Sequence, residues 1–172
     1  MVTVTSAPGH ATAWTVAAAV PDPELPMVTI GDLGILRDVA VDGAEVIATI
    51  TPTYSGCPAM REIAHDVRHR LVRAGFDRVT VRHQLAPPWT TDWITSDGRR
   101  KLAEHGIAPP RPNTRGPVRL NLTSKQEQLG HVACPRCGST RTAQMASFSG
   151  TACKALYRCG SCREPFEYVK PF

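Results

Sequence analysis

The chain is organised around one turn between a strand and a helix, Thr51-Pro52-Thr53-Tyr54-Ser55-Gly56-Cys57-Pro58-Ala59-Met60. The residues before this turn, 45–51, predict a strand that ends at Pro52, because proline has no amide to donate to a sheet. After the turn, apolar side chains recur at helical spacing to about residue 74, and a glycine typical of a helix end follows. Gly56 permits a sharp turn and Pro58 suits the first helical position, so Cys57 is the expected N-cap.

Cys57 is the first candidate for a functional residue. A sulfur at a helix N-terminus faces unpaired backbone N–H groups and the positive end of the helix dipole, and both favour the thiolate over the thiol. A thiolate in such a turn is a nucleophile or a ligand for a soft metal. Free cysteines are also often buried as small apolar residues. Spacing alone does not separate a functional Cys57 from a packed one.

The segments around this turn predict a compact α+β domain, a small sheet packed with helices, over residues 12–107. Asp42-Gly43 is a strong hairpin signal between two strand-like runs, and residues 78–85 alternate with the period of a further strand. Two helices are expected outside the central one, at residues 11–20 and at about 97–105, the second capped by Ser96 or Thr95. Trp89 and Trp93 are expected to cover the core, with a docking face as the alternative.

The last 42 residues carry two Cys-x-x-Cys pairs, Cys134/Cys137 and Cys159/Cys162, separated by 21 residues. Two such pairs offer four sulfurs at the spacing of a tetrahedral site, which predicts a zinc ribbon over residues 131–172 with Zn²⁺ as a structural ion. A proline-rich linker is expected between the two domains, at residues 108–130. Two disulfides are the alternative, disfavoured by the cytoplasmic location expected of a chain without a leader or an apolar span. The fifth cysteine of this region, Cys153, is expected to be idle or buried.

Charge is unevenly distributed along the chain. The formal net charge of +5 divides into −2 over residues 1–107, +3 over residues 108–130 and +4 over residues 131–172. Zinc bound by four thiolates would lower the charge of the last segment by 2. The tail is then only mildly basic, and its aromatic residues can serve a thin core: Phe148, Tyr157, Phe166, Tyr168 and Phe172. Nucleic acid is therefore not expected as a partner, although it is the usual one for an isolated four-cysteine module.

Several of these motifs resemble a known family. Asp22-Pro23-Glu24-Leu25-Pro26, Asp32-Leu33-Gly34 and the Thr51-to-Cys57 turn resemble the small domain shared by bacterial and eukaryotic iron–sulfur assembly factors. Residues 12–172 as a whole, with Pro87–Trp93 and the ending Ala152-Cys153-Lys154-Ala155-Leu156-Tyr157-Arg158-Cys159, resemble the PaaD family of the phenylacetyl-CoA epoxidase system. That resemblance implies an accessory or maturation role in aerobic phenylacetate catabolism, beside a di-iron oxygenase and a reductase carrying flavin and an iron–sulfur cluster.

Enzymatic motifs do not appear in the sequence. It has no Glu-x-x-His pair for a di-iron site, no Gly-x-Gly-x-x-Gly and no glycine-rich phosphate loop. The leading hypothesis is an accessory factor that helps to load iron or an iron–sulfur cluster. Cys57 is then a transient ligand, with Asp22, Glu24 and Thr51 around it, and the partner is the oxygenase or its reductase.

Three alternatives stay open. The chain could be a purely structural or docking subunit, a nucleic-acid-binding ribbon protein, or a thiol enzyme that uses Cys57, for which no histidine lies nearby in sequence to act as a base. The sequence also leaves open which epoxidase protein is engaged, whether a cluster is bound at rest and whether the chain is a homodimer.

Overall fold

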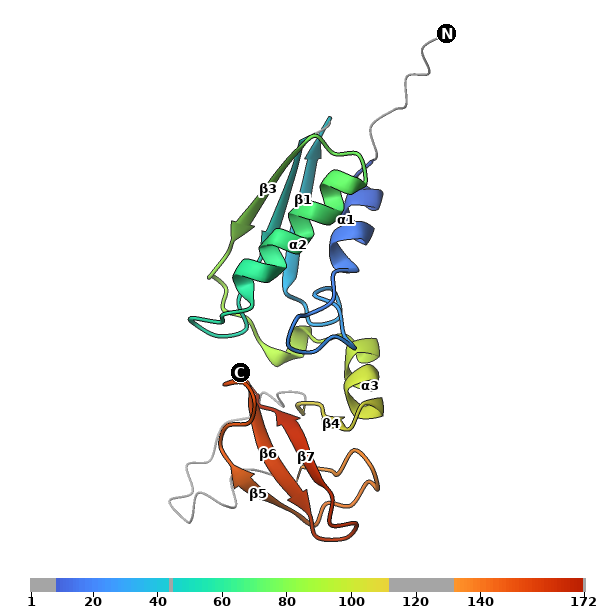
Figure 1. Ribbon diagram of the computed structural model, residues 1–172, viewed down its shortest axis with the longest axis vertical. Coiled ribbons are helices and arrows are strands. Elements are labelled where there is room, and N and C mark those ends of the chain that lie inside the picture. The colour runs from blue at the N-terminus through green and yellow to red at the C-terminus, as the bar shows by residue number, and fades with distance from the viewer. Residues whose placement is uncertain (1–8, 44, 112–131, 172) are drawn as a thin grey trace. The chain divides into compact units, whose positions relative to one another are not determined.

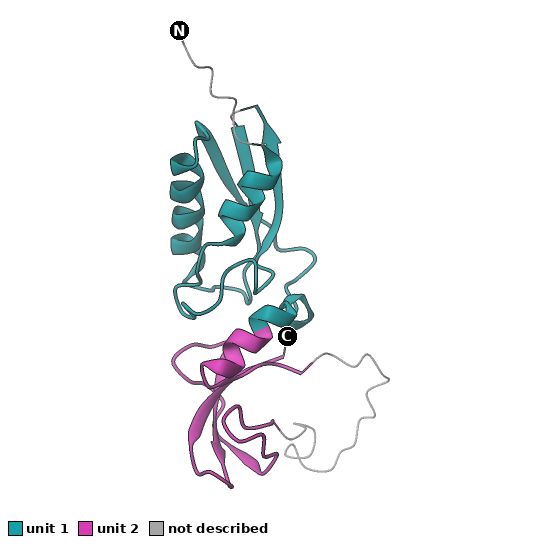
Figure 2. Cartoon of the chain, turned by 90° about the vertical axis from the view of Figure 1, so that its right-hand side faces the viewer, with its two compact units in different colours: residues 1–98 teal, residues 99–172 magenta. Residues whose placement is uncertain are grey.

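The computed structural model describes residues 9–43, 45–111 and 132–171, and the chain divides into two compact units, Met1–Gly98 and Arg99–Phe172 (Figure 2). The division falls inside a helix, α3 (Ser96–Glu104), earlier than the boundary expected at residue 107. The reason is that β4 (Ile107–Ala108) pairs with a strand of the second unit. Of the linker expected at residues 108–130, Ala108 belongs to β4, and residues 112–130 lie outside the described residues. No helix within the described ranges is long and apolar enough to span a membrane.

The first unit contains a three-stranded sheet in the order β1-β2-β3. β1 (Leu36–Asp42) and β2 (Glu45–Ile50) form the predicted antiparallel hairpin, with Gly43 at a positive φ of 58°. β3 (Arg78–His83) is parallel to β2, because α2 (Met60–Arg73) carries the chain back to the same end of the sheet. The hairpin followed by a crossover therefore gives a mixed sheet.

Two helices pack on one face of this sheet, α1 (His10–Ala18) and α2 (Figure 1). α2 buries the stripe that the sequence predicts, and α1 buries two alanines, which allow close approach. β2 alternates buried and half-buried side chains along its length, so its buried side chains supply the floor of the core. The resulting core of helices and sheet contains Ala13, Ala17, Val46, Ala48, Ile50, Ile63, Val67 and Leu71.

The segment after β3 closes the end of the unit. Trp89 is buried and donates its indole N–H to the carbonyl of Leu33 over 2.9 Å, as expected of a residue that covers the core. Trp93, in a short 3₁₀ helix (Thr91–Trp93), is half-buried, and the guanidinium of Arg37 lies 3.5 Å from its ring centroid. Thr95 caps α3 as predicted, since its hydroxyl accepts the Gly98 N–H at 3.0 Å.

The second unit contains a four-stranded sheet in the order β4-β7-β6-β5. β5 (Thr142–Ala146), β6 (Lys154–Cys159) and β7 (Pro165–Val169) are antiparallel, and β4 joins the edge of β7 in parallel. Tyr157 stacks on Phe166 and meets Tyr168 edge-on, with ring centroids 5.8 and 5.5 Å apart. These three aromatic residues form the predicted thin core, whereas Phe148 is 64% exposed and Phe172 lies outside the described residues.

Candidate functional site

Cys57 lies in the loop between β2 and α2, but it is not the N-cap of the helix. α2 begins at Met60, and its N-cap is Ala59. The difference arises because the chain makes a separate turn first: the Cys57 amide donates to the Tyr54 carbonyl over 3.2 Å, and Gly56 adopts a positive φ of 86°. The prediction of Cys57 as N-cap is therefore wrong, although a half-buried thiol does lie between the strand and the helix.

The Asp22-Pro23-Glu24 loop is held close to Cys57. Asp22 is buried, and its Oδ1 accepts the N–H groups of Glu24 and Leu25, each at 2.9 Å. The amide of Asp22 donates to the Val28 carbonyl over 3.0 Å, which closes the loop on itself. Both carboxylates act electrostatically on the Cys57 thiol. The charges of two carboxylates that are distant in sequence thus reach Cys57, but among the described residues only the four cysteines of the second unit have ligand atoms close enough together to hold one metal ion.

The electrostatics of Cys57 are the reverse of those expected from a helix N-terminus. Burial raises the pKa of the Cys57 thiol, and the negative charges of Glu24 and Asp22 raise it further. Hydrogen bonds from the Ala59 amide and the Thr53 side chain lower it, but by less. The expectation of a favoured thiolate is therefore wrong. A thiol with a raised pKa stays protonated at neutral pH.

The two threonines of this loop have different roles. Thr51 is buried at the end of β2, its amide donates to the Ile35 carbonyl over 2.9 Å, and its hydroxyl has no hydrogen-bond partner among the described residues. Thr51 thus makes no hydrogen bond to Cys57. Thr53, which the sequence reasoning missed, provides that hydroxyl instead. Thr53 could have been identified from its position, because it lies inside the turn that contains Cys57, whereas Thr51 lies at the end of the preceding strand.

The cysteines of the two Cys-x-x-Cys pairs come together in the second unit. The four sulfurs all lie within 4.8 Å of one another, and no disulfide links them: Cys134, Cys137, Cys159 and Cys162. The first pair occupies a turn before β5, in which the Gly138 amide donates to the Cys134 carbonyl and the Cys134 amide to the Ser139 carbonyl, each over 2.9 Å. In the second pair, Cys159 is the last residue of β6 and Cys162 lies in the turn that leads to β7.

The sulfur positions fit a tetrahedral metal ion. The Cys134 and Cys162 sulfurs are 3.7 Å apart, and those of Cys137 and Cys159 are 3.6 Å apart. A tetrahedral ion with metal–sulfur bonds of about 2.3 Å requires sulfur–sulfur distances of about 3.8 Å. Two cysteines of the set are buried and two are exposed, so the group closes the end of the sheet while one side meets solvent. Four sulfurs fill such a shell and leave no position for a substrate.

Backbone amides and neighbouring sulfurs set the charges of this group. The N–H groups of Cys162 and Ser161 lower the pKa of Cys159 to about 6 against the effect of burial, and the Ser161 amide lies 3.3 Å from its sulfur. At Cys162 the Glu164 amide favours the thiolate, but burial and the other three sulfurs outweigh it and raise the pKa to about 12. Four thiolates therefore need a cation between them.

Two further groups with metal-binding side chains lie outside both sites. Cys153 is half-buried, with its sulfur 3.0 Å from the Thr151 hydroxyl, and does not belong to the four-cysteine group. His65 and His69 on α2 are exposed, and their rings are parallel with centroids 6.2 Å apart. Neither group adds a ligand to the four cysteines.

Two family models match the chain, one in each of its two units. A family model described as iron–sulfur cluster assembly protein matches residues 11–81, and one described as PaaD zinc beta ribbon domain matches residues 120–170. The crystal structure of a domain of unknown function, DUF59, from Bacillus anthracis resembles about half of the chain. Its TM-score is 0.50 at 30% identity, over 54% of this chain and 90% of that one. The α+β fold predicted from the sequence is confirmed by this likeness.

One curated relative matches nearly the whole chain. It is a putative subunit of the 1,2-phenylacetyl-CoA epoxidase of Escherichia coli strain K12, and it is 45% identical over 91% of this chain and 90% of its own length. A match of 157 residues is longer than either unit alone and therefore spans both of them. The resemblance read from the sequence is thus confirmed, and the chain belongs to the PaaD family of phenylacetyl-CoA epoxidase subunits.

Proposed function

We propose that this chain is a non-catalytic accessory subunit that helps to load iron or an iron–sulfur cluster into the oxygenase or the reductase of a phenylacetyl-CoA epoxidase system. The observation that carries the proposal is the Cys57 thiol beside the Asp22 and Glu24 carboxylates, within a domain matched by an iron–sulfur assembly family. In this proposal the Cys57 sulfur is the one soft ligand that the first unit supplies, the two carboxylates add negative charge near it, and the partner protein provides the remaining ligands. The relationship to the epoxidase subunits of the PaaD family supports the choice of partner.

The arrangement suits transfer better than storage. The two carboxylates attract a cation, and the thiol gives up its proton only when the cation arrives, so binding is coupled to proton release. An iron–sulfur cluster usually takes four protein ligands, so one cysteine cannot hold it without ligands from a second chain or a small thiol. The Asp22 carboxylate keeps its loop in place by accepting two backbone N–H groups, so little ordering is needed when iron binds.

The second unit has a separate role in this proposal. Its four cysteines hold one Zn²⁺, whose closed tetrahedral shell supplies folding free energy and no chemistry. The zinc-bound unit then acts as a docking module. We favour Zn²⁺ over an iron–sulfur cluster at these cysteines because the sulfurs lie within 4.8 Å of one another, a spacing for one ion.

The test compares Cys57→Ala with Cys153→Ala, a matched change at the other half-buried thiol outside the four-cysteine group. Each variant replaces the natural chain in cells grown aerobically on phenylacetate, and the oxygenase and reductase are purified without oxygen. We expect Cys57→Ala to fold normally and to leave these proteins short of iron or sulfide, while Cys153→Ala leaves them fully loaded. Iron, sulfide and zinc contents are the readout.

A different result would favour the structural-subunit alternative. If cells with Cys57→Ala grow normally and contain fully metallated partners, then Cys57 is only a packed residue. If both variants reduce metal content equally, the effect comes from stability rather than from the Cys57 site. Thermal unfolding of the two purified variants separates these outcomes, because a specific loss of transfer leaves the unfolding temperature unchanged.

A further inference from the structure

Helix α2 carries most of the arginines of a first unit that is acidic as a whole. Residues 1–98 contain 7 arginines and 11 aspartates and glutamates, with no lysine. Four of the seven arginines lie on α2 and all four are exposed: Arg61, Arg68, Arg70 and Arg73. α2 also carries Glu62 and Asp66, so its arginines exceed its carboxylates by two, whereas the unit as a whole has more carboxylates than arginines. Such an uneven distribution produces a local field that can select a partner.

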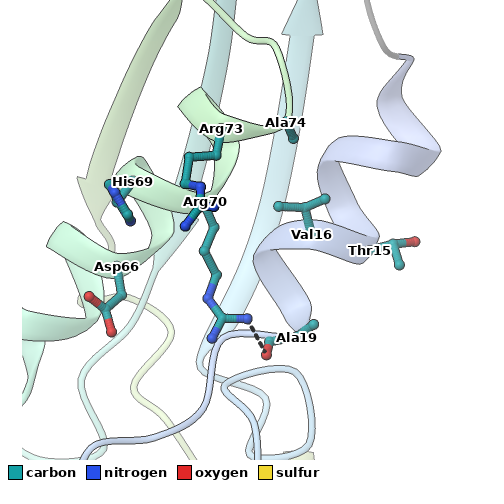
Figure 3. A pocket seen from close by; sticks show the side chains of 8 residues that line it. All are labelled: Thr15, Val16, Ala19, Asp66, His69, Arg70, Arg73 and Ala74. Carbon is teal, nitrogen blue, oxygen red and sulfur yellow. Dashed lines mark hydrogen bonds between the residues drawn. The ribbon is translucent and has the colours of Figure 1, made fainter.

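Two of these arginines line a groove between α1 and α2 (Figure 3). The groove has a volume of about 730 Å³, and its α1 side is formed by Thr15, Val16 and Ala19. Its α2 side is formed by Asp66, His69, Arg70, Arg73 and Ala74. The groove therefore combines a small apolar floor with a cationic rim, and it lies entirely within the first unit.

The two groove arginines are not equivalent. Arg70 donates from Nη1 to the Ala19 carbonyl over 3.2 Å, so one edge of its guanidinium caps the C-terminal end of α1 (Figure 3). Arg73 forms no ion pair with any residue that the structure describes, and in Figure 3 its side chain lies beside that of Arg70. Asp66, the one carboxylate of the groove, faces His65 at 3.3 Å. Arg73 and the outer edge of Arg70 thus remain for a ligand.

Guanidinium groups recognise carboxylates with two parallel hydrogen bonds, and the adjacent apolar floor accepts aliphatic side chains. We propose that the α1–α2 groove docks an acidic, partly apolar peptide segment of an epoxidase-system protein. The identity of the protein that carries this segment rests on the proposed function above. The charge of the groove supports an acidic ligand. The acidic surfaces of the first unit repel an acidic chain, whereas the arginines of the groove attract it.

The proposal deepens the proposed function by adding a docking surface on the first unit to the docking role of the zinc-bound unit, and by separating this surface from the Cys57 loop. The Cys57 loop precedes α2, and the groove lies along α2 toward its C-terminal end, where Arg70, Arg73 and Ala74 are. Docking and metal binding then use different residues, so each can be removed while the other stays. This separation makes the docking groove testable without relying on iron transfer.

The experiment measures the affinity of the full-length, zinc-loaded chain for the purified oxygenase complex and for the purified reductase by biolayer interferometry. The test variant is Arg73→Glu. The matched control is Arg68→Glu, which makes the same charge change at an exposed arginine of the same helix outside the groove. We expect Arg73→Glu to weaken binding at least about tenfold and Arg68→Glu to change it by no more than about twofold. The wild-type affinity should also fall as salt is raised.

Two controls distinguish this proposal from the proposed function. Cys57→Ala should bind the epoxidase proteins like the wild type while failing to load them, and Arg73→Glu should lose binding while its Cys57 site still takes a metal ion. The docking proposal is overturned by wild-type binding in Arg73→Glu, by equal losses in both charge variants, or by a wild type that binds neither protein. It is also overturned if Arg73→Glu changes only the oligomeric state of the chain, which would make the groove a self-association surface, or only an affinity for nucleic acid.

Discussion

Cys57 and the four-cysteine group use the same ligand atom in opposite ways. In the second unit four sulfurs lie within 4.8 Å of one another and can enclose an ion completely. In the first unit one sulfur shares its surroundings with two carboxylates, and its pKa is raised, whereas that of Cys159 is lowered to about 6. In the function that we propose, the four-cysteine group retains a cation, and the Cys57 site binds one only transiently. The number and charge of neighbouring groups, rather than the cysteine itself, decide which role a sulfur has.

The largest expected effect comes from removing two of the four cysteines of the second unit. Replacing Cys134 and Cys162 by serine should abolish zinc binding and unfold residues 132–171, because structural zinc supplies about 10–16 kcal/mol of apparent binding free energy to small domains. The first unit should keep its fold, since its core contains none of these residues. Zinc analysis with residue-resolved NMR measures both results. Full zinc retention in the double variant would show that other ligands hold the ion.

The next prediction concerns the surroundings of Cys57 in the first unit. Glu24→Gln should weaken the binding of Co²⁺, a spectroscopic substitute for iron, at least about tenfold, because a neighbouring negative charge is lost. The same change should speed alkylation of Cys57 at pH 8 by about two- to threefold, since removal of that charge lowers the thiol pKa. Glu45→Gln, an exposed-carboxylate change at the opposite end of β2 from the Cys57 loop, is the control. This electrostatic explanation would be contradicted if Glu24→Gln weakened Co²⁺ binding and also slowed the alkylation of Cys57, or if it strengthened the one and accelerated the other.

A smaller effect concerns an ion pair that stabilises the second unit in addition to its metal ion. Lys154 is buried, and its Nζ lies 2.8 Å from Oε2 of Glu167. The other oxygen of this carboxylate, Oε1, accepts a hydrogen bond from the Ser149 hydroxyl. Burial raises the pKa of Glu167, but these hydrogen bonds and the charge of Lys154 outweigh it, and the net pKa is lowered. Glu167→Gln should destabilise the second unit by about 1–3 kcal/mol at pH 7, with the exposed Glu164→Gln close to neutral.

The sign of the pH dependence follows from that lowered pKa. The stabilisation by Glu167 is complete above the ordinary carboxyl pKa and is lost as the pH falls through the lower pKa of the folded state. The difference in unfolding free energy between wild type and Glu167→Gln should therefore shrink as the pH is lowered from about 7, over the range in which the four cysteines still hold zinc. Denaturant titrations of the zinc-loaded proteins measure it, and a difference that grows on acidification would refute the assignment.

The last prediction is that the second unit does not bind nucleic acid. The exposed arginines of the second unit are partly engaged within it: Arg141 donates to the Ser161 hydroxyl over 3.0 Å, and Arg158 donates to the Arg163 carbonyl over 3.3 Å. We expect no measurable affinity for duplex or single-stranded nucleic acid at physiological salt. Fluorescence anisotropy over a range of salt concentrations tests this. Tight binding with a steep salt dependence would assign the second unit to nucleic acid.

The sequence predicts those parts of the molecule that depend on local spacing. The hairpin at Gly43, the buried stripe of α2 and the assembly of four sulfurs follow from residues close in sequence or from the strict Cys-x-x-Cys interval. The pKa of Cys57 could not be predicted in this way, because it depends on burial and on carboxylates more than thirty residues earlier in the chain. The start of α2 was also missed, because Pro58 suits a turn as well as a first helical position.

Exposure was equally difficult to predict from composition. Phe148 has the character of a core residue, but its ring packs against the ammonium of Lys170, 4.3 Å from the ring centroid, at the surface. The parallel pairing of β4 with β7 had no local signal, since β4 consists of only Ile107 and Ala108. Two residues are too few to show a periodicity.

That short pairing decides where the protein can be cut. β7 has β6 on one side and β4 on the other, so a fragment that starts at residue 131 would leave one side of β7 without its backbone partners. An open strand edge is a template for pairing with other chains and promotes aggregation. A fragment that starts at residue 99 keeps β4 and hence a closed edge on β7. The metal-binding tail is thus complete only with residues that precede it by more than twenty positions in the chain.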